Sequence, residues 1–126
     1  MDSEKVLNQY VKALEKGLYN EIIHLFAEDA VVHSPLYGNV EASIFYTELF
    51  TDTKKSHIKV LNTFTGENAG AVHFLYTWIL ADGIKTSFEC VDVFEFSCGK
   101  IKDLTIIYDT YRVRKAFETM KIKMEK

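Results

Sequence analysis

The sequence predicts an α+β fold, and three observations support this. Apolar residues recur at helical spacing before residue 50, and from His57 onward apolar and polar residues alternate. Short turn signals separate the alternating runs, which indicates antiparallel neighbours in a sheet. Helices that come first and a sheet that follows favour helices packed on one sheet face. The length of 126 residues suits a single domain, 1–126.

Three helices are expected before the sheet. The first has Asp2 or Ser3 as its cap and Gly17 as its stop. Asn20 is the expected cap of a short second helix, and the third covers about Glu41 to Phe50. The expected packing positions are Val6, Leu7, Tyr10, Val11, Leu14 and Leu18 in the first helix, Ile22, Ile23, Leu25 and Phe26 in the second, and Ile44, Phe45, Leu49 and Phe50 in the third.

Five strands are expected after the second helix. A short one, residues 30–34, ends where Pro35 cannot continue the pairing. Thr51 to Ser56 is expected to be a polar loop, and residues 113–126 a C-terminal helix or tail. The remaining strands are expected at about residues 57–66, 70–81, 84–97 and 100–111, with turns at Glu67-Asn68, Asp82-Gly83 and Cys98-Gly99.

Composition and charge exclude several classes of function. A net charge of −3 gives no reason to expect nucleic acid or an anionic membrane as partner. The longest apolar run, 74–81, is far shorter than the ~18 residues of a membrane span. Cys90 and Cys98 lie too far apart along one strand for a disulfide, and free thiols favour a cytoplasmic location. Ligand spacings and phosphate-binding loops are missing, so we expect no metal and no cofactor.

Asp92 is the residue that most needs an explanation. In the strand 84–97, alternation places it on an apolar face among Phe88, Cys90 and Phe94. An ionised carboxylate in such a setting is costly unless it is paired, hydrogen-bonded or protonated. Asp92 is therefore either a satisfied structural carboxylate or a functional group.

The pairing across the Asp82-Gly83 turn decides which residues of the preceding strand accompany Asp92. A two-residue loop places Leu75 opposite Cys90 and His73 opposite Asp92, and we expect this register. A three-residue loop with a glycine bulge would shift it by one and put Phe74 and Tyr76 inside instead. With the two-residue loop, His73 and Asp92 form a structural ion pair or an acid/base couple.

The same register turns an apolar strip outward. It consists of Val72, Phe74, Tyr76, Trp78 and Leu80. A monomer rarely exposes such a strip, and few residues remain to cover it. We therefore expect a homodimer that packs through the outer sheet face, with Phe74, Tyr76 and Trp78 in the interface.

Five segments, taken in order along the chain, suggest a known family: Tyr10-Val-Lys-Ala-Leu14, Ile23 to Ala30, Ser34-Pro35 with Gly38, Val91 to Phe96, and Gly99 to Ile101. They resemble the nuclear transport factor two-like superfamily, and within it the SnoaL-like polyketide cyclase and ketosteroid isomerase group. The resemblance covers about Val6 to Tyr111. It implies a cone-shaped curved antiparallel sheet with three N-terminal helices on its concave face, a cystatin-like α+β barrel.

The resemblance also implies roles for three residues. The oxyanion-hole tyrosine of the ketosteroid isomerases falls on Tyr10, and their oxyanion-hole aspartic acid falls on Asp92; such a neutral carboxylic acid is known from that enzyme. The general-base position falls on Ser34, and a serine hydroxyl cannot take that role without a base beside it. Steroid isomerisation is therefore not expected. The cavity lining implied by the resemblance is His73, Leu75, Thr77, Leu104, Ile106 and Tyr108, to which the strand register adds Cys90.

Three functions remain open at this stage. The first is a cofactor-independent isomerase, cyclase or dehydratase for a small hydrophobic carbonyl compound. In it Tyr10 and Asp92 hold the oxyanion, His73 moves the proton, and Ser34 orients substrate or water. The second is a non-catalytic carrier of an apolar ligand, and the third is a dimerisation module with an incidental cavity.

Overall fold

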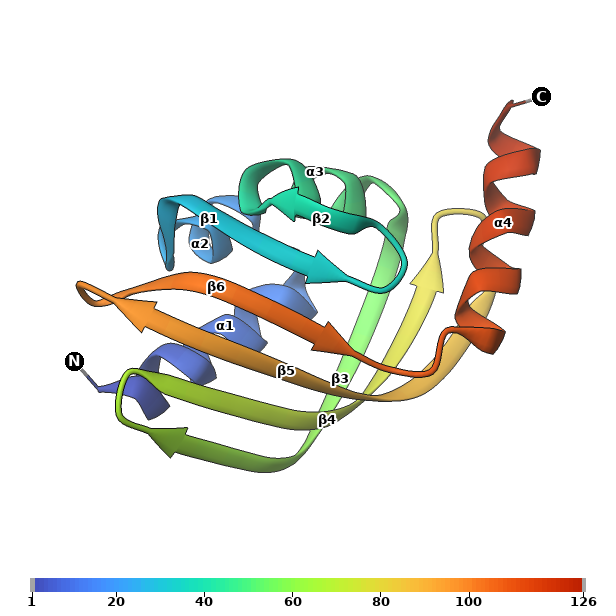
Figure 1. The fold of residues 1–126 in the computed structure, drawn as a ribbon. Helices are drawn as coiled ribbons and strands as arrows, with labels where there is room; N and C mark the ends of the chain where they lie inside the picture. Colours follow the sequence, from blue (N-terminus) through green and yellow to red (C-terminus); the bar gives the residue numbers. More distant parts are fainter. Residues whose placement is uncertain (1, 126) are drawn as a thin grey trace.

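Six strands form one curved, open sheet in the computed structural model, which describes residues 2–125 (Figure 1). The strand order is β2-β1-β6-β5-β4-β3, and all neighbours are antiparallel except β1 and β6, which are parallel. The predicted α+β fold with three N-terminal helices is confirmed, with a sheet that does not close. The elements are α1 (Ser3–Lys16), α2 (Tyr19–His24), β1 (Phe26–Ser34), β2 (Gly38–Glu41), α3 (Ala42–Thr51), β3 (Thr53–Gly66), β4 (Ala69–Leu80), β5 (Lys85–Ser97), β6 (Lys100–Ile107) and α4 (Tyr111–Glu125).

The first helix begins and ends as its sequence predicts. The side chain of Asp2 accepts a hydrogen bond from the backbone N–H of Lys5, 3.1 Å away, and satisfies an otherwise free donor of the first turn. Gly17 follows the helix with a φ of 68°, a left-handed conformation that glycine adopts without strain. The inner face of α1 buries Leu7, Tyr10, Ala13 and Leu14.

The structure differs from the prediction at several boundaries. Helix α2 follows Leu18, so Asn20 is not its cap, and Phe26 already belongs to β1. Strand β2 was not expected, because its four residues are mostly exposed and show no alternation. Strand β3 begins at Thr53, inside the expected loop, since pairing with β4 continues to Leu80. The predicted C-terminal helix is present as α4, and residue 126 lies outside the described residues.

The register between β4 and β5 is the main correction. The backbone N–H of Leu80 bonds the carbonyl of Ile84 at 2.9 Å, so three residues, 81–83, form the loop. Gly83 has a φ of 92°, as a three-residue hairpin loop with a glycine requires. The predicted two-residue loop is therefore wrong. A shift by one residue exchanges the faces of β4, because its side chains alternate. Phe74 accordingly pairs with Cys90, and Val72 with Asp92.

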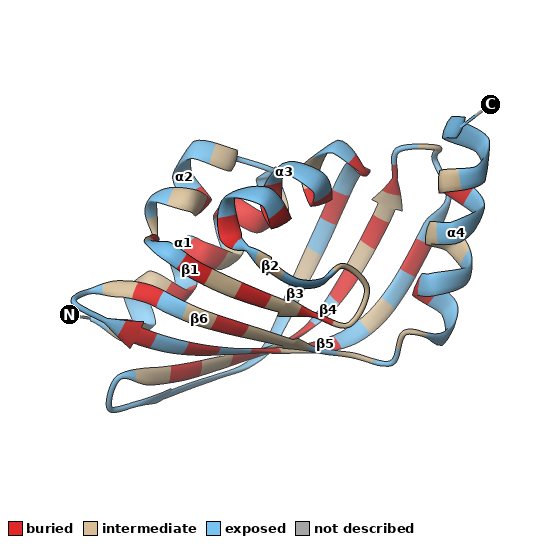
Figure 2. Ribbon diagram, turned by 45° about the horizontal axis from the view of Figure 1, so that its top comes forward, coloured by how far each residue is buried: buried red, intermediate tan, exposed pale blue. Residues whose placement is uncertain are grey.

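This exchange moves two groups of side chains. Phe74, Tyr76 and Trp78 are buried under the helices, so the predicted dimer interface through these three residues is wrong. His73, Leu75 and Thr77 lie on the outer face instead of the cavity side. The alternation of buried and exposed residues along the strands is visible in Figure 2.

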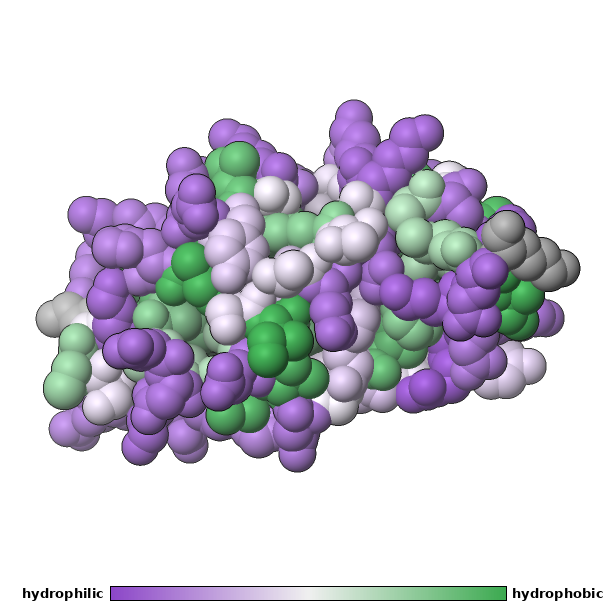
Figure 3. All heavy atoms as spheres, turned by 90° about the horizontal axis from the view of Figure 1, so that it is seen from above, coloured by the Kyte–Doolittle hydropathy of each residue, from purple (hydrophilic) through white to green (hydrophobic). Residues whose placement is uncertain are grey.

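The surface of the molecule is mixed in polarity on the face that lies at the top of Figure 1. Figure 3 shows hydrophobic side chains in small groups separated by hydrophilic ones on the face seen from above. None of the helices within residues 2–125 combines the length and the apolar character that crossing a membrane requires.

Candidate functional site

A pocket lies between the helices and the concave side of the sheet. It encloses about 450 Å³ that protein atoms do not fill, including its open mouth. The partly buried lining residues form the mouth of the pocket. On one side they come from the β1–β2 turn, and on the other side from β5, from β6 and from the segment that follows β6. They are Leu36, Tyr37, Phe88, Ile106 and Tyr108. The deeper lining consists of Tyr10, Leu14, Ser34, Phe45, Leu49, Phe74, Tyr76, Trp78, Cys90 and Asp92.

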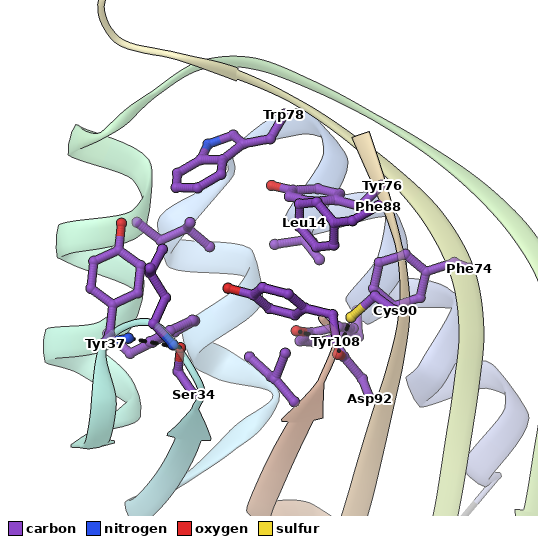
Figure 4. Close-up of a pocket in the computed structure, with 15 residues that line it drawn as sticks. Leu14, Ser34, Tyr37, Phe74, Tyr76, Trp78, Phe88, Cys90, Asp92 and Tyr108 are labelled. Atoms are coloured by element: carbon purple, nitrogen blue, oxygen red, sulfur yellow. Dashed lines mark hydrogen bonds between the residues drawn. The ribbon is translucent and has the colours of Figure 1, made fainter. Parts of the chain in front are cut away.

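Asp92 contributes a carboxyl group to this largely apolar space. Its exposed fraction is 1%, and both oxygens have a partner: the hydroxyl of Tyr10 donates to Oδ2 at 3.1 Å, and the thiol of Cys90 donates to Oδ1 at 3.2 Å (Figure 4). The hydroxyl of Tyr46 lies 2.8 Å from that of Tyr10 and extends the network into α3. Asp92 is thus held in one position by α1 and by its own strand.

Burial sets the protonation of this network. It raises the pKa of Asp92 to about 7, and the hydrogen bonds from Cys90 and Tyr10 partly oppose the rise. Burial also raises the pKa of the Cys90 thiol and of the Tyr10 hydroxyl, so both remain protonated donors. Asp92 therefore exchanges its proton near neutral pH, whereas its neighbours do not.

The two oxyanion-hole residues implied by the resemblance are brought together, but in another arrangement than expected. The only proton of the Tyr10 hydroxyl is directed at Asp92. With Asp92 ionised, Tyr10 is therefore not a second donor aimed at the same ligand oxygen; it supports Asp92.

The Cys90→Ala variant tests this description of Asp92. Because the thiol hydrogen bond lowers the pKa of Asp92, its removal is expected to raise that pKa further above 7. The measurement is a pH titration of the Asp92 side-chain carboxyl carbon by NMR in both proteins. Cys98→Ala, at an exposed position, is the control and is expected to leave the titration unchanged. An unshifted midpoint in Cys90→Ala would contradict the proposed contact.

Ser34 faces the same pocket from the end of β1. Its Oγ accepts hydrogen bonds from the backbone N–H groups of Leu36 and Tyr37, at 3.2 and 3.0 Å. These two bonds occupy the lone pairs that a base would need, and they leave the hydroxyl proton available. Ser34 can therefore donate a hydrogen bond to a ligand, and Figure 4 shows it on the side of the pocket away from Asp92.

Helix α4 packs beside the pocket mouth. Phe117 contacts the rings of Tyr37 and Trp78, with centroids 5.3 and 6.4 Å apart. Asp52, with an exposed fraction of 1%, accepts bonds of 2.7 Å from both the Tyr37 hydroxyl and the Lys121 ammonium group. This buried carboxylate thus fixes a mouth residue and α4 to one another.

The predicted site residues divide into three groups. Tyr10, Ser34, Cys90, Asp92, Ile106 and Tyr108 line the pocket. Leu104 is fully buried but packs in the core outside the pocket lining. His73, Leu75 and Thr77 lie on the outer face, and the predicted placement of these three in the cavity is wrong because of the hairpin register.

His73 and His33 have hydrogen-bond partners outside the pocket. His73 lies 2.8 Å from a carboxylate oxygen of Glu89 and 3.0 Å from the amide nitrogen of Asn62. His33 lies between Asn39 and Asp103, and its hydrogen bond to Asp103 raises its pKa. Neither reaches the pocket lining, so Asp92 has no histidine partner there. Among the described residues, groups of three or more His, Cys, Asp or Glu that could hold a metal ion are absent.

Sequence reasoning missed much of the aromatic lining. The two-residue loop assigns Phe74, Tyr76 and Trp78 to an outer strip, although their alternation with His73, Leu75 and Thr77 marks them as the more apolar face. The more apolar face of a strand usually faces the core, and this rule favours the three-residue loop, which turns Phe74, Tyr76 and Trp78 inward. Tyr37 and Tyr46 reach the site through the β1–β2 turn and α3, and periodicity alone does not place them there.

Comparison with known proteins gives a family and a fold. A family model of the SnoaL-like domain matches residues 7–104. The sequence has no significant match among curated proteins. Many solved structures are similar, at identities that show the fold alone.

Three of these structures illustrate the different proteins that share the fold. A putative polyketide cyclase from Pseudomonas putida has a TM-score of 0.79 and 16% identity, over 91% of this chain and 97% of its own. AclR, a putative hydroxylase from Streptomyces galilaeus, has a TM-score of 0.75 and 14% identity, over 92% and 80%. TerC, co-crystallised with polyporic acid, has a TM-score of 0.74 and 12% identity, over 91% and 97%.

Proposed function

The chain belongs to the SnoaL-like domain family, and from this premise we propose that it is a cofactor-independent enzyme that moves a proton on a small, mostly apolar carbonyl compound. The reaction type would be that of an isomerase, cyclase or dehydratase. The observation that carries the proposal is Asp92: a buried carboxyl in an apolar pocket, positioned by two donors, with a pKa of about 7.

Asp92 takes the role that the sequence had assigned to His73. Its ionised form removes a proton from the carbon beside the carbonyl group, and the electrons of that C–H bond move into a C=C bond as the carbonyl oxygen becomes an enolate. Ser34, whose hydroxyl proton is available, donates a hydrogen bond to this oxygen. Protonated Asp92 then returns the proton to carbon, which completes the cycle without a cofactor.

The aromatic lining supports an apolar substrate. Phe74, Tyr76, Trp78 and Phe88 surround the space beside Asp92 and Cys90 (Figure 4). Apolar walls lower the local dielectric constant, which strengthens the hydrogen bonds to an enolate.

Exchange of carbon-bound protons in heavy water tests the function without knowledge of the natural substrate. A set of small apolar ketones, such as 2-tetralone, would be incubated with the protein in D₂O and followed by NMR. Deuterium incorporation beside the carbonyl group, faster than in buffer alone, is expected. Absence of enzyme-dependent exchange for every ketone that binds would contradict the proposal.

A carrier function is the second candidate, and one observation favours it. Asp92 is the only pocket residue whose pKa lies near neutrality, so the pocket has no second group to relay a proton. TerC was co-crystallised with polyporic acid, which is consistent with ligand binding by this fold. Binding of an aromatic alcohol such as 2-naphthol, without exchange of the carbon-bound protons of any ketone, would support the carrier function.

We also propose a homodimer through the outer sheet face, with different residues from those predicted. Three apolar side chains of neighbouring strands are exposed on this face: Phe64 of β3, Val93 of β5 and Ile107 of β6. Their exposed fractions are 57, 38 and 54%. Leu75 adds a further exposed apolar side chain on the same face. Together they form an apolar area on this sheet face, which a second copy could cover.

Val93→Lys is expected to convert the dimer into a monomer, because it places a charge in the centre of the apolar rows. Molar mass from size-exclusion chromatography with light scattering provides the measurement. Ile44→Lys, at an exposed position of α3, is the control and should leave the mass unchanged. A wild-type protein that is monomeric at high concentration would rule the dimer out.

A further inference from the structure

We propose that Arg114 and Tyr108 form an anion-binding subsite at the pocket mouth, so that the ligand is an apolar compound with a carboxylate or another anionic group at its outer end. This inference rests on the proposed function, since it assigns a substrate class to the same pocket. It concerns α4, which follows the last residue of the family match.

The first step is the position of Arg114. Its guanidinium group donates a hydrogen bond of 2.9 Å to the carbonyl oxygen of Pro35, in the turn between β1 and β2. The neighbours of Pro35, namely Ser34 and Leu36, both line the pocket. This bond holds the guanidinium beside the mouth and uses one of its five N–H donors.

One face of α4 accounts for this position. Arg114, Phe117 and Lys121 are three and four residues apart, which places them on the same side of the helix. All three contact the opposite rim: Arg114 bonds Pro35, Phe117 packs on Tyr37, and Lys121 pairs with Asp52. This face of α4 is therefore fixed beside the pocket mouth, and Figure 1 shows α4 at the end of the sheet remote from the N-terminus.

The second step is the charge of Arg114. Within residues 2–125 it belongs to none of the ion pairs. Asp52 is paired with Lys121 and Asp82 with Lys123, and Asp109 accepts a bond from the backbone N–H of Tyr111. Glu118, one turn further along α4, forms no ion pair with Arg114 among the described residues. Arg114 is thus a positioned cation with unused donors, in the fork geometry that suits a carboxylate.

Tyr108 supplies the second donor. Its ring lines the pocket against Phe88, 4.4 Å between centroids, and its hydroxyl has no hydrogen-bond partner among the described residues. Figure 4 shows this hydroxyl directed across the pocket toward the side of Tyr37 and Ser34. Burial raises the pKa of Tyr108, and the charge of Arg114 acts in the opposite direction.

Two naphthol probes test the subsite by binding alone. One is 2-naphthol, and the other is 6-hydroxy-2-naphthoate, which adds a carboxylate at the far end of the same ring system. In the wild type we expect the carboxylate to increase affinity about tenfold, the effect of one charge-assisted contact. Arg114→Gln should reduce this preference while leaving the affinity for 2-naphthol unchanged. Tyr108→Phe should reduce the preference as well. Dissociation constants from fluorescence titrations provide the measurement.

Arg112→Gln is the matched control. Arg112 is exposed on the same helix, but two residues from Arg114, and therefore points in another direction. Equal affinities for both probes in the wild type, or an equal loss in Arg112→Gln, would overturn the subsite while the pocket function survives. Failure of both probes to bind would overturn the pocket function as well.

Discussion

Asp92→Asn is expected to abolish deuterium exchange, with a loss of about 100-fold or more, which is the usual contribution of a general acid or base. The amide retains the shape and can keep the hydrogen bond from Tyr10, but it cannot accept a proton from carbon. Binding of 2-naphthol should persist, since the apolar walls are intact. Rates of exchange with saturating ketone, compared with the dissociation constants, separate the two effects.

The pH dependence gives an independent check of the same role. Removal of a proton from carbon requires ionised Asp92, so the wild-type exchange rate should rise with pH and level off above the pKa of about 7. Tyr10→Phe, which removes a stabilising donor, should shift this profile to higher pH. A flat profile, or substantial activity in Asp92→Asn, would show that another group moves the proton.

Phe74→Ala is expected to destabilise the protein by about 3–5 kcal/mol, the usual cost of removing a buried aromatic side chain. Phe74 has an exposed fraction of 2% and packs edge to face with Tyr76, 6.2 Å between ring centroids. The loss combines the burial of the ring with a cavity that its neighbours cannot fill. Urea unfolding followed by circular dichroism measures the change.

Leu75→Ala is the matched control for that experiment. Leu75 follows Phe74 in β4 but points to the outer face, with an exposed fraction of 39%. When both variants are measured in the Val93→Lys background, where the chain is expected to be monomeric, its truncation should cost less than about 1 kcal/mol. The opposite ranking of the two variants would restore the two-residue hairpin and contradict the register on which the pocket depends.

The order of helices and strands was predictable because it depends on local patterns. The cap at Asp2, the stop at Gly17 and the alternation along β5 each follow from neighbours in sequence. Asp92 was identifiable for the same reason: it interrupts an apolar face.

The composition of the site was harder to predict because it depends on one loop. The assignment of His73 to the pocket followed from a two-residue turn, and the third loop residue turned that side chain outward. The contacts of Arg114 and Lys121 depend on how α4 docks, for which no periodicity in the sequence provides the partner. Local sequence patterns therefore predict the helices and strands. The length of the β4–β5 loop and the packing of α4 determine which side chains come into contact.

The ionised form of Asp92, which the proposed catalysis requires, is also the form that lowers the stability of the folded protein. In the folded chain its pKa is about 7, against 3.8 for an unperturbed aspartate, so between these values the folded protein keeps a proton that the unfolded chain has released. The stability that Asp92 contributes is thus complete below about pH 4 and is lost as pH rises through 7. The difference corresponds to about 4 kcal/mol. The proposed enzyme would be most active where this residue weakens its fold most, so part of its folding free energy is exchanged for a reactive base.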